Sequence, residues 1–147
     1  MITIDDPILK VLSKVPLFAG LDRMHLIWYL SMSERRDVAA GGQFFDEQDP
    51  GATCFVLIRG TAVVERRIAG ETVVIDELRP GDTFGEVSLV DSHPRFSRVK
   101  ATTDAVALEF KTPPLDTAPE TAMVIFKNIA KMQSLRIRRN NEKLYVK

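Results

Sequence analysis

The pattern of hydrophobic positions divides the chain into successive zones, and the first is typical of helices. From residue 5 to about residue 34, apolar side chains recur at spacings of three and four, as on one face of a helix. The positions that define these faces are Leu9, Leu12, Val15, Leu26, Ile27 and Leu30. Trp28 and Tyr29 lie within the second face, so we expect both rings to pack in the core.

The next zone, from about residue 36 to residue 110, consists of short β-rich runs separated by turn signals. The predicted strands cover 44–45, 54–58, 61–67, 72–75, 99–101 and 106–110. Glycine or proline stands between most of these runs, which is typical of a β-sandwich or barrel. The sequence therefore predicts a mainly β centre that follows N-terminal helices.

A long helix is predicted for the C-terminal zone, over residues 118 to about 142. Pro113 and Pro114 end the last strand, and Thr117 with Glu120 has the spacing of a capping box. The apolar stripe of this helix consists of Ala122, Ile125, Phe126, Ile129 and Met132. Such a stripe suits packing on the chain's own strands and pairing with a second copy equally well. The cations of the second half complement the negative end of the helix dipole.

Composition narrows the functional classes. The chain has 147 residues, 45% of them hydrophobic, which predicts one domain over residues 1–147. The formal net charge is zero, which argues against a nucleic-acid partner, and no apolar stretch is long enough to span a membrane. Cys54 is the only cysteine, so no internal disulfide can form, and we expect a core position for it and a cytoplasmic location for the protein.

The sequence contains no recognisable pattern of catalytic or metal-binding residues. With two histidines and one cysteine, the chain lacks the ligands of a structural zinc site. No serine or cysteine stands with a base at a recognisable spacing, and no paired acid and base is visible. We therefore expect no enzyme activity, no catalytic residue, no metal and no cofactor.

The segment from Phe84 to Leu89, followed by Pro94 and Arg95, carries the candidate chemistry. A Gly85–Glu86 pair precedes Arg95 by nine residues, counted from the glutamate. The guanidinium of an arginine suits a phosphate because it donates parallel hydrogen bonds. An ionised carboxylate only accepts, so Glu86 suits a hydroxyl group. A ribose phosphate offers both groups.

These segments, in this order, resemble the cyclic nucleotide-binding domain of catabolite-activator-type regulators, kinase regulatory subunits and gated channels. The resemblance runs from about Leu17 to Lys143. Residues 54–60 resemble the family's strand that ends in glycine, residues 78–86 the lead-in to its phosphate-binding cassette, and Pro94-Arg95 its phosphate-binding arginine. The resemblance implies a double-stranded β-helix, or jelly roll, with N-terminal helices and a long C-terminal helix. It also implies that the chain carries no DNA-binding domain of its own.

The resemblance implies a regulatory module that binds a cyclic nucleotide and signals through its C-terminal helix. Arg95 would bind the phosphate, Glu86 the ribose 2′-hydroxyl, and the amides near Gly85 the phosphate oxygens. Because no threonine follows Arg95, cAMP is favoured over cGMP. The C-terminal helix would also pair two copies in a homodimer. The implied ligand-binding residues are Phe84, Gly85, Glu86, Val87, Ser88, Pro94, Arg95, Phe96 and Ser97.

Departures from the family pattern keep a second hypothesis open. Phe96 stands where the family has a small residue, and its ring either fills the cassette or turns outward. Arg98 either helps to hold the phosphate or points away from it. Arg95 could pair with Glu86 or Asp91 in an empty pocket. The alternative function is therefore a degenerate, ligand-free domain that serves dimerisation or protein interaction.

Overall fold

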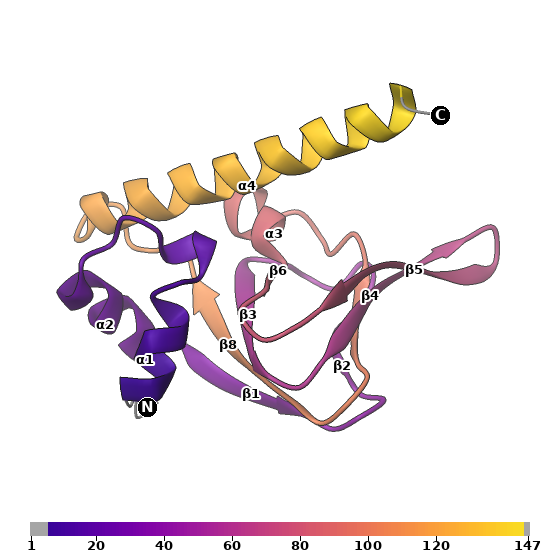
Figure 1. Cartoon of the computed structure of the whole chain (residues 1–147), viewed down its shortest axis with the longest axis horizontal. Coiled ribbons are helices and arrows are strands. Elements are labelled where there is room, and N and C mark those ends of the chain that lie inside the picture. The colour runs from indigo at the N-terminus through magenta and orange to yellow at the C-terminus, as the bar shows by residue number, and fades with distance from the viewer. Residues whose placement is uncertain (1–5, 146–147) are drawn as a thin grey trace.

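A computed structural model describes residues 6–145 of the chain. Two four-stranded antiparallel sheets form the centre of the molecule (Figure 1). One sheet has the order β1-β8-β3-β6 and the other has the order β2-β7-β4-β5. The strands are β1 (Glu34–Val38), β2 (Gln43–Phe45), β3 (Thr53–Arg59), β4 (Ala62–Ile68), β5 (Glu71–Leu78), β6 (Thr83–Phe84), β7 (Arg98–Ala101) and β8 (Ala105–Lys111). This arrangement confirms the predicted jelly roll.

Helices flank the roll on one end and along one side. The N-terminal helices α1 (Asp6–Leu12), η1 (Pro16–Phe18) and α2 (Arg23–Ser31) gather beside β8 (Figure 1). The short helix α3 (Glu86–Asp91) follows β6. The long helix α4 (Pro119–Tyr145) crosses above α3 and β6 in the view of Figure 1.

Strand β1, Glu34–Val38, was not among the predicted strands. Four of the five residues of β1 are exposed, so the strand lacks the alternation that would identify it in the sequence. Its pairing with β8 places it in the sheet.

Strand β3 shows why its sequence is continuously apolar. Cys54 and Val56 belong to the core beneath the helices, while Phe55 and Leu57 belong to the core between the sheets. Both faces of β3 are thus covered, and a strand buried on both faces needs no polar side. Cys54 is fully buried, as predicted, and this burial raises the pKa of its thiol.

Helix α2 buries only part of the apolar face that was predicted for it. Leu26, Tyr29 and Leu30 are buried, and the Tyr29 hydroxyl donates to the Lys111 carbonyl at 2.7 Å. Ile27 and Trp28, however, are 40% and 38% exposed. The prediction of a core position for Trp28 was therefore wrong, whereas that for Tyr29 is confirmed, and Ile27 does not belong to the buried face of the helix.

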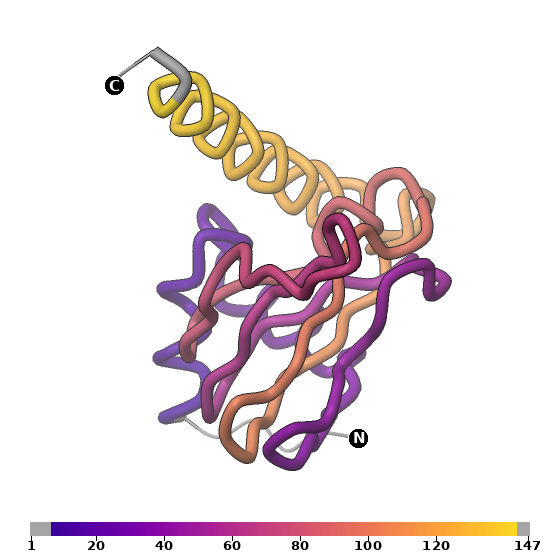
Figure 2. Tube along the Cα trace, turned by 90° about the vertical axis from the view of Figure 1, so that its right-hand side faces the viewer, coloured from indigo at the N-terminus to yellow at the C-terminus, as the bar shows by residue number. Residues whose placement is uncertain are grey.

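The first half of α4 packs on the chain's own core. Ala122, Ile125 and Ile129 are at most 2% exposed, and Ile125 and Ile129 pack with residues of η1, α2 and β8. The Asn128 amide donates to the carbonyls of Leu17 and Ala19, each at 2.8 Å. The most buried part of the stripe is therefore unavailable to a second copy. Figure 2 shows the second half of the helix projecting beyond the roll.

The start of α4 differs slightly from the prediction. The Ala118 carbonyl accepts the first helical hydrogen bond, from the Ala122 amide at 3.0 Å, and the helix begins at Pro119. Ala118 is therefore the cap residue, and Thr117 lies one position too early to form the predicted capping box. Pro119 occupies the first helical position, where its missing N–H costs no hydrogen bond.

Candidate functional site

Gly85 connects β6 to α3 and leaves no room for a side chain. Its φ of +74° lies in the left-handed region, which glycine adopts at little cost. A Cβ atom at this position would lie 2.7 Å from Nη1 of Arg95. The backbone conformation therefore favours glycine here, and a larger residue would displace the Arg95 guanidinium.

The Arg95 side chain is buried and faces neutral acceptors. It is 4% exposed. Its Nη1 donates to the carbonyls of Thr53 at 2.9 Å and Gly85 at 3.0 Å, and its Nη2 donates to Oγ1 of Thr53 at 3.0 Å. The guanidinium lies over the ring of Phe45, 4.3 Å from its centre, which is a cation–π contact.

The backbone around Arg95 is held by the turn that precedes β3. The Arg95 amide donates to the Asp49 carbonyl, and the Gln48 amide donates to the Arg95 carbonyl, both at 2.8 Å. Ser88 of α3 fixes the preceding residues, because its hydroxyl donates to the His93 carbonyl at 3.0 Å. These contacts hold the backbone on both sides of the Arg95 side chain.

The charge of Arg95 is incompletely balanced. Among residues 6–145, Arg95 forms no salt bridge, so the hypothesis that it pairs with Glu86 or Asp91 is wrong. Burial lowers the pKa of Arg95, while nearby Glu109 and other groups oppose that shift. Its Nε is buried and has no hydrogen-bond partner within the described residues. A buried cation with an unused donor is costly unless an anion reaches it.

Glu86 connects the cassette to α4. Glu86 is 2% exposed, and its Oε1 accepts a hydrogen bond from Nε2 of Gln133 at 2.8 Å. Nη2 of Arg136 lies 3.4 Å from the same oxygen. Over the described part of the chain, Oε2 has no hydrogen-bond partner. One carboxylate oxygen is therefore held by α4 and the other is left to accept.

Gln133 and Arg136 are site residues that the sequence analysis missed. They lie four and seven positions after Ile129, so they continue the face of the helix that the apolar stripe begins. Their polar side chains do not count in a search for hydrophobic periodicity. Following the stripe's face beyond its last apolar residue would have found both.

One open pocket brings the predicted residues together, apart from Pro94. Pro94 instead lines a separate groove, which it shares with Arg95 and the turn that precedes β3. The pocket wall also includes residues that were not predicted, namely Asp76 and Leu78 of β5, Val64 of β4, Phe45, Thr83, Val99 and Arg136. Its predicted members are Phe84, Gly85, Glu86, Val87, Ser88, Arg95, Phe96 and Ser97.

Phe96 and Arg98 both point away from the guanidinium of Arg95. Phe96 is 63% exposed, and the Arg66 guanidinium lies 3.5 Å from the centre of its ring. Arg98 pairs with Asp46 at 3.0 Å and approaches Glu65 at 4.0 Å. The aromatic ring therefore stands at the rim of the pocket without filling it, and Arg98 does not reach the phosphate position that the resemblance implies.

A jelly roll with a buried arginine in the wall of one small pocket is the architecture of a small-molecule-binding domain. The chain belongs to the cyclic nucleotide-binding domain family, whose profile, described as "Cyclic nucleotide-binding domain", matches residues 35–118. This match covers β2 to β8 with the whole of the cassette, and all but the first residue of β1. It confirms the family predicted from the sequence.

Several known proteins resemble the chain over much of its length. It is 24% identical over 136 residues to a CRP-like cAMP-activated global transcriptional regulator of Mycobacterium tuberculosis, covering 92% of this chain and 61% of that protein. It is 34% identical over 92 residues to a cAMP-dependent protein kinase regulatory subunit of Eremothecium gossypii, covering 63% of this chain and 19% of that protein.

Among solved structures, the N-terminal domain of a transcriptional regulator from Streptomyces coelicolor A3(2) aligns with a TM-score of 0.76 and 28% identity. That alignment covers 92% of this chain and 96% of the other. By their names, all three relatives are regulators or parts of regulators. Within residues 6–145, no helix has the length and apolar character needed to cross a membrane.

Proposed function

We propose that this chain binds a cyclic nucleotide, cAMP in the first place, and acts as a regulatory module rather than as an enzyme. The observation that carries the proposal is the buried Arg95 guanidinium, which within residues 6–145 lacks an anionic partner and has an unused Nε donor. The names of the relatives from Mycobacterium tuberculosis and Eremothecium gossypii, both tied to cAMP, support this choice of nucleotide.

The two charged side chains divide the ligand between them. Arg95 binds the cyclic phosphate, which supplies the missing anion. Oε2 of Glu86 accepts from the ribose 2′-hydroxyl, while Oε1 stays with Gln133 and Arg136 of α4. Ligand and helix then share one carboxylate, so binding shifts the population of α4 positions and the helix transmits the signal.

Calorimetric titration with cAMP and cGMP tests this proposal. We expect micromolar binding of cAMP by the wild type, and a loss of about a hundredfold or more in Arg95→Met, which removes the charge but keeps much of the length. Arg98→Met is the matched control, because it removes a guanidinium that pairs with Asp46 outside the pocket. Its affinity should stay within about threefold of the wild type.

Two results would contradict the proposal: no heat with the wild type at millimolar nucleotide, or equal affinities for Arg95→Met and Arg98→Met. Circular dichroism of each variant shows whether it is folded. Arg95→Lys is a second variant that keeps the test decisive if Arg95→Met loses stability. It retains the positive charge but has a shorter reach and a single donor group. It should then bind with intermediate affinity.

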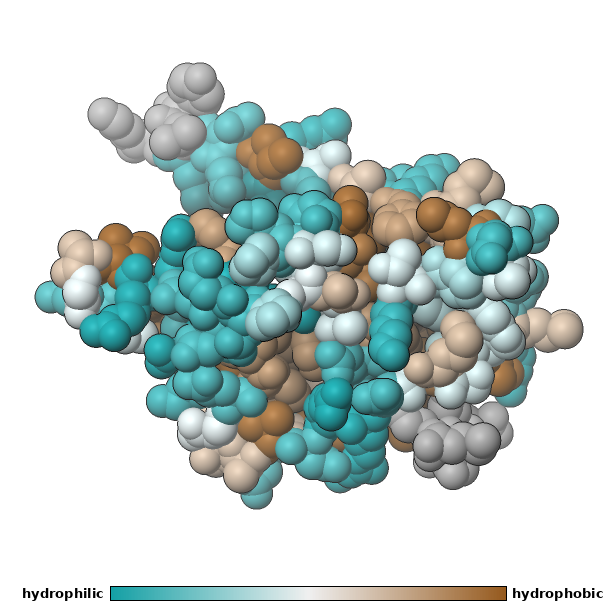
Figure 3. Space-filling view, turned by 180° about the vertical axis from the view of Figure 1, so that it is seen from behind, coloured by the Kyte–Doolittle hydropathy of each residue, from teal (hydrophilic) through white to brown (hydrophobic). Residues whose placement is uncertain are grey.

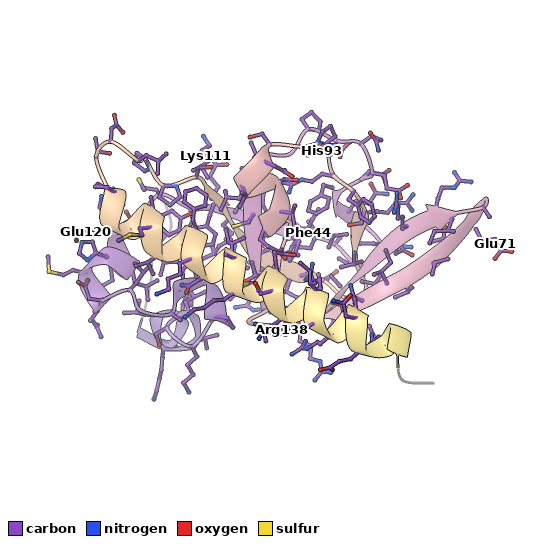
Figure 4. All side chains as sticks on the ribbon, turned by 90° about the horizontal axis from the view of Figure 1, so that it is seen from above. Phe44, Glu71, His93, Lys111, Glu120 and Arg138 are labelled. Atoms are coloured by element: carbon purple, nitrogen blue, oxygen red, sulfur yellow. The ribbon has the colours of Figure 1, made fainter. Side chains whose placement is uncertain are left out.

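A homodimer is the second proposal, and exposed apolar side chains favour it. Leu135 and Ile137 of α4 are 52% and 59% exposed, and the β4–β5 hairpin exposes Ile68, Val73, Val74 and Ile75. Both elements project from the roll (Figure 1). The hairpin end shows an apolar group on the hydropathy surface (Figure 3). Figure 4 shows α4 running from Glu120 past the cassette to Arg138, with Glu71 at the hairpin tip.

Charge indicates that a second copy covers these elements. The end of α4, residues 136–143, carries four cations and one carboxylate, Glu142. The β4–β5 hairpin, residues 62–78, carries four carboxylates and two cations, Arg66 and Arg67, so the two elements have opposite net charge. The helix of one copy therefore complements the hairpin of another, as a two-fold arrangement requires. Sedimentation should show a dimer that Ile137→Asp dissociates without unfolding. A wild type that stays monomeric at high concentration contradicts it, and a dimer without nucleotide binding supports the ligand-free alternative.

A further inference from the structure

Asp76 places a carboxylate in the wall of the nucleotide pocket. It lies on β5 opposite Val64 of β4, and both residues line the pocket. Leu78, two positions further on the same strand, lines it as well, whereas Glu77 between them does not. Because side chains alternate along a strand, Asp76 and Leu78 share the pocket face and Glu77 lies on the other face.

The Asp76 carboxylate has capacity to accept from a ligand. Its Oδ1 accepts from the Glu77 amide at 2.9 Å, and in the part of the chain that the structure describes Asp76 forms no salt bridge. The other charged groups of the wall are engaged: Glu86 with Gln133 and Arg136, and Arg95 with Thr53 and Gly85. Asp76 is therefore the charged wall residue without a side-chain partner among the described residues.

The position of Asp76 assigns it to the base of the nucleotide. With the phosphate at Arg95 and the ribose at Glu86, the rest of the wall is left for the base. That remainder includes the apolar side chains of Val64 and Leu78, and its acidic group is Asp76. An ionised carboxylate accepts hydrogen bonds and repels carbonyl lone pairs. Adenine presents an amino group at its 6 position, whereas hypoxanthine and guanine present an oxygen there.

We infer that Asp76 determines base specificity by accepting a hydrogen bond from the 6-amino group of adenine, and that it thereby disfavours cyclic nucleotides with a 6-oxo group. The inference rests on the proposed nucleotide site and names the residue that selects the base. Because Asp76 lies on the exposed edge strand, solvent weakens the interaction, and the expected preference is about tenfold.

The test compares cAMP with cyclic inosine monophosphate, which carries a 6-oxo group in place of the 6-amino group. In calorimetric titrations the wild type should bind cAMP about tenfold more tightly. In Asp76→Ala this ratio should fall to about one, mainly through weaker cAMP binding. Glu77→Ala is the matched control, since it removes one negative charge from the same strand on the opposite face, and it should keep the wild-type ratio.

Asp76→Asn adds a second measurement, because its amide can accept from an amino group and also donate to an oxo group. It should raise the affinity for cyclic inosine monophosphate. An unchanged ratio in Asp76→Ala, with nucleotide still bound, overturns this inference alone. Tightest binding of cGMP that depends on Asp76 overturns the adenine assignment. Binding of none of these nucleotides by the wild type overturns both this inference and the proposed function.

Discussion

The two charged ends of the pocket are built in different ways. At one end, Arg95 is held by Thr53 and Gly85, which belong to β3 and to the turn after β6. At the other end, Glu86 is held by Gln133 and Arg136, which belong to α4. The roll thus preforms the anion end, while the ribose end depends on where the helix lies. Affinity and signalling can therefore be separated by mutation.

The largest effect that sharpens this comparison is expected from Gly85→Ala. The added Cβ would lie 2.7 Å from Nη1 of Arg95 and displace the guanidinium, and the left-handed φ would strain the backbone. We expect a cAMP affinity about thirtyfold or more below that of the wild type, because a charge-assisted contact is lost. The free energy of unfolding should fall by about 1–2 kcal/mol. Calorimetry and urea denaturation measure the two quantities.

Gly41→Ala is the matched control for that variant. Gly41 also has a left-handed φ, of +86°, but a Cβ atom there would meet nothing within 4 Å. It should lose a similar amount of stability through backbone strain and keep its affinity for cAMP. If both variants bind equally well, the preformed anion end does not depend on the close approach of Gly85 and Arg95.

The second effect is expected from Arg136→Met, which changes the ribose end of the pocket, where α4 holds Glu86. We expect cAMP to increase the hydrogen-exchange protection of α4 amides beyond Ile129, since the ribose and the helix share Glu86. In Arg136→Met this increase should fall by at least half, and cAMP affinity should decrease only about threefold. Hydrogen exchange with mass spectrometry, in the presence and absence of cAMP, measures the difference.

Arg139→Met serves as the control for this coupling. Arg139 is exposed on the same helix, and its replacement removes the same charge without touching Glu86. It should leave the nucleotide-dependent protection as in the wild type. Full protection in Arg136→Met would show that the carboxylate does not couple ligand and helix.

The same division explains what the sequence could predict. Periodicity located most strands and α4, because strand β3 and the helix stripe are buried along nearly their whole apolar runs. It missed β1, whose exposed charged residues become a strand only through pairing with β8. It also placed Trp28 in the core, although this residue is exposed. The apolar character of one helical residue does not indicate which side of the helix packs on the roll.

At the site, local sequence predicted the roll end better than the helix end. Gly85, Glu86 and Arg95 lie within one short segment, so their spacing alone predicted a shared pocket. Asp76 and Arg136 reach the same pocket from β5 and α4, which only the tertiary fold brings together. The neutral partners of Arg95 were likewise beyond sequence reasoning, because two of them are backbone carbonyls.

The smallest expected effect is that of Phe96→Ser, which restores the small residue typical of the family next to Arg95. Because the ring is 63% exposed and contacts Arg66 outside the pocket, its removal should change cAMP affinity by no more than about twofold. Loss of the stack on Arg66 should lower the free energy of unfolding by about 0.5–1 kcal/mol. Arg66→Met removes the same stack from the other side and should cost a similar amount. An affinity gain of tenfold or more in Phe96→Ser would instead show that the ring competes with the nucleotide, and the anion end would then be preformed but blocked.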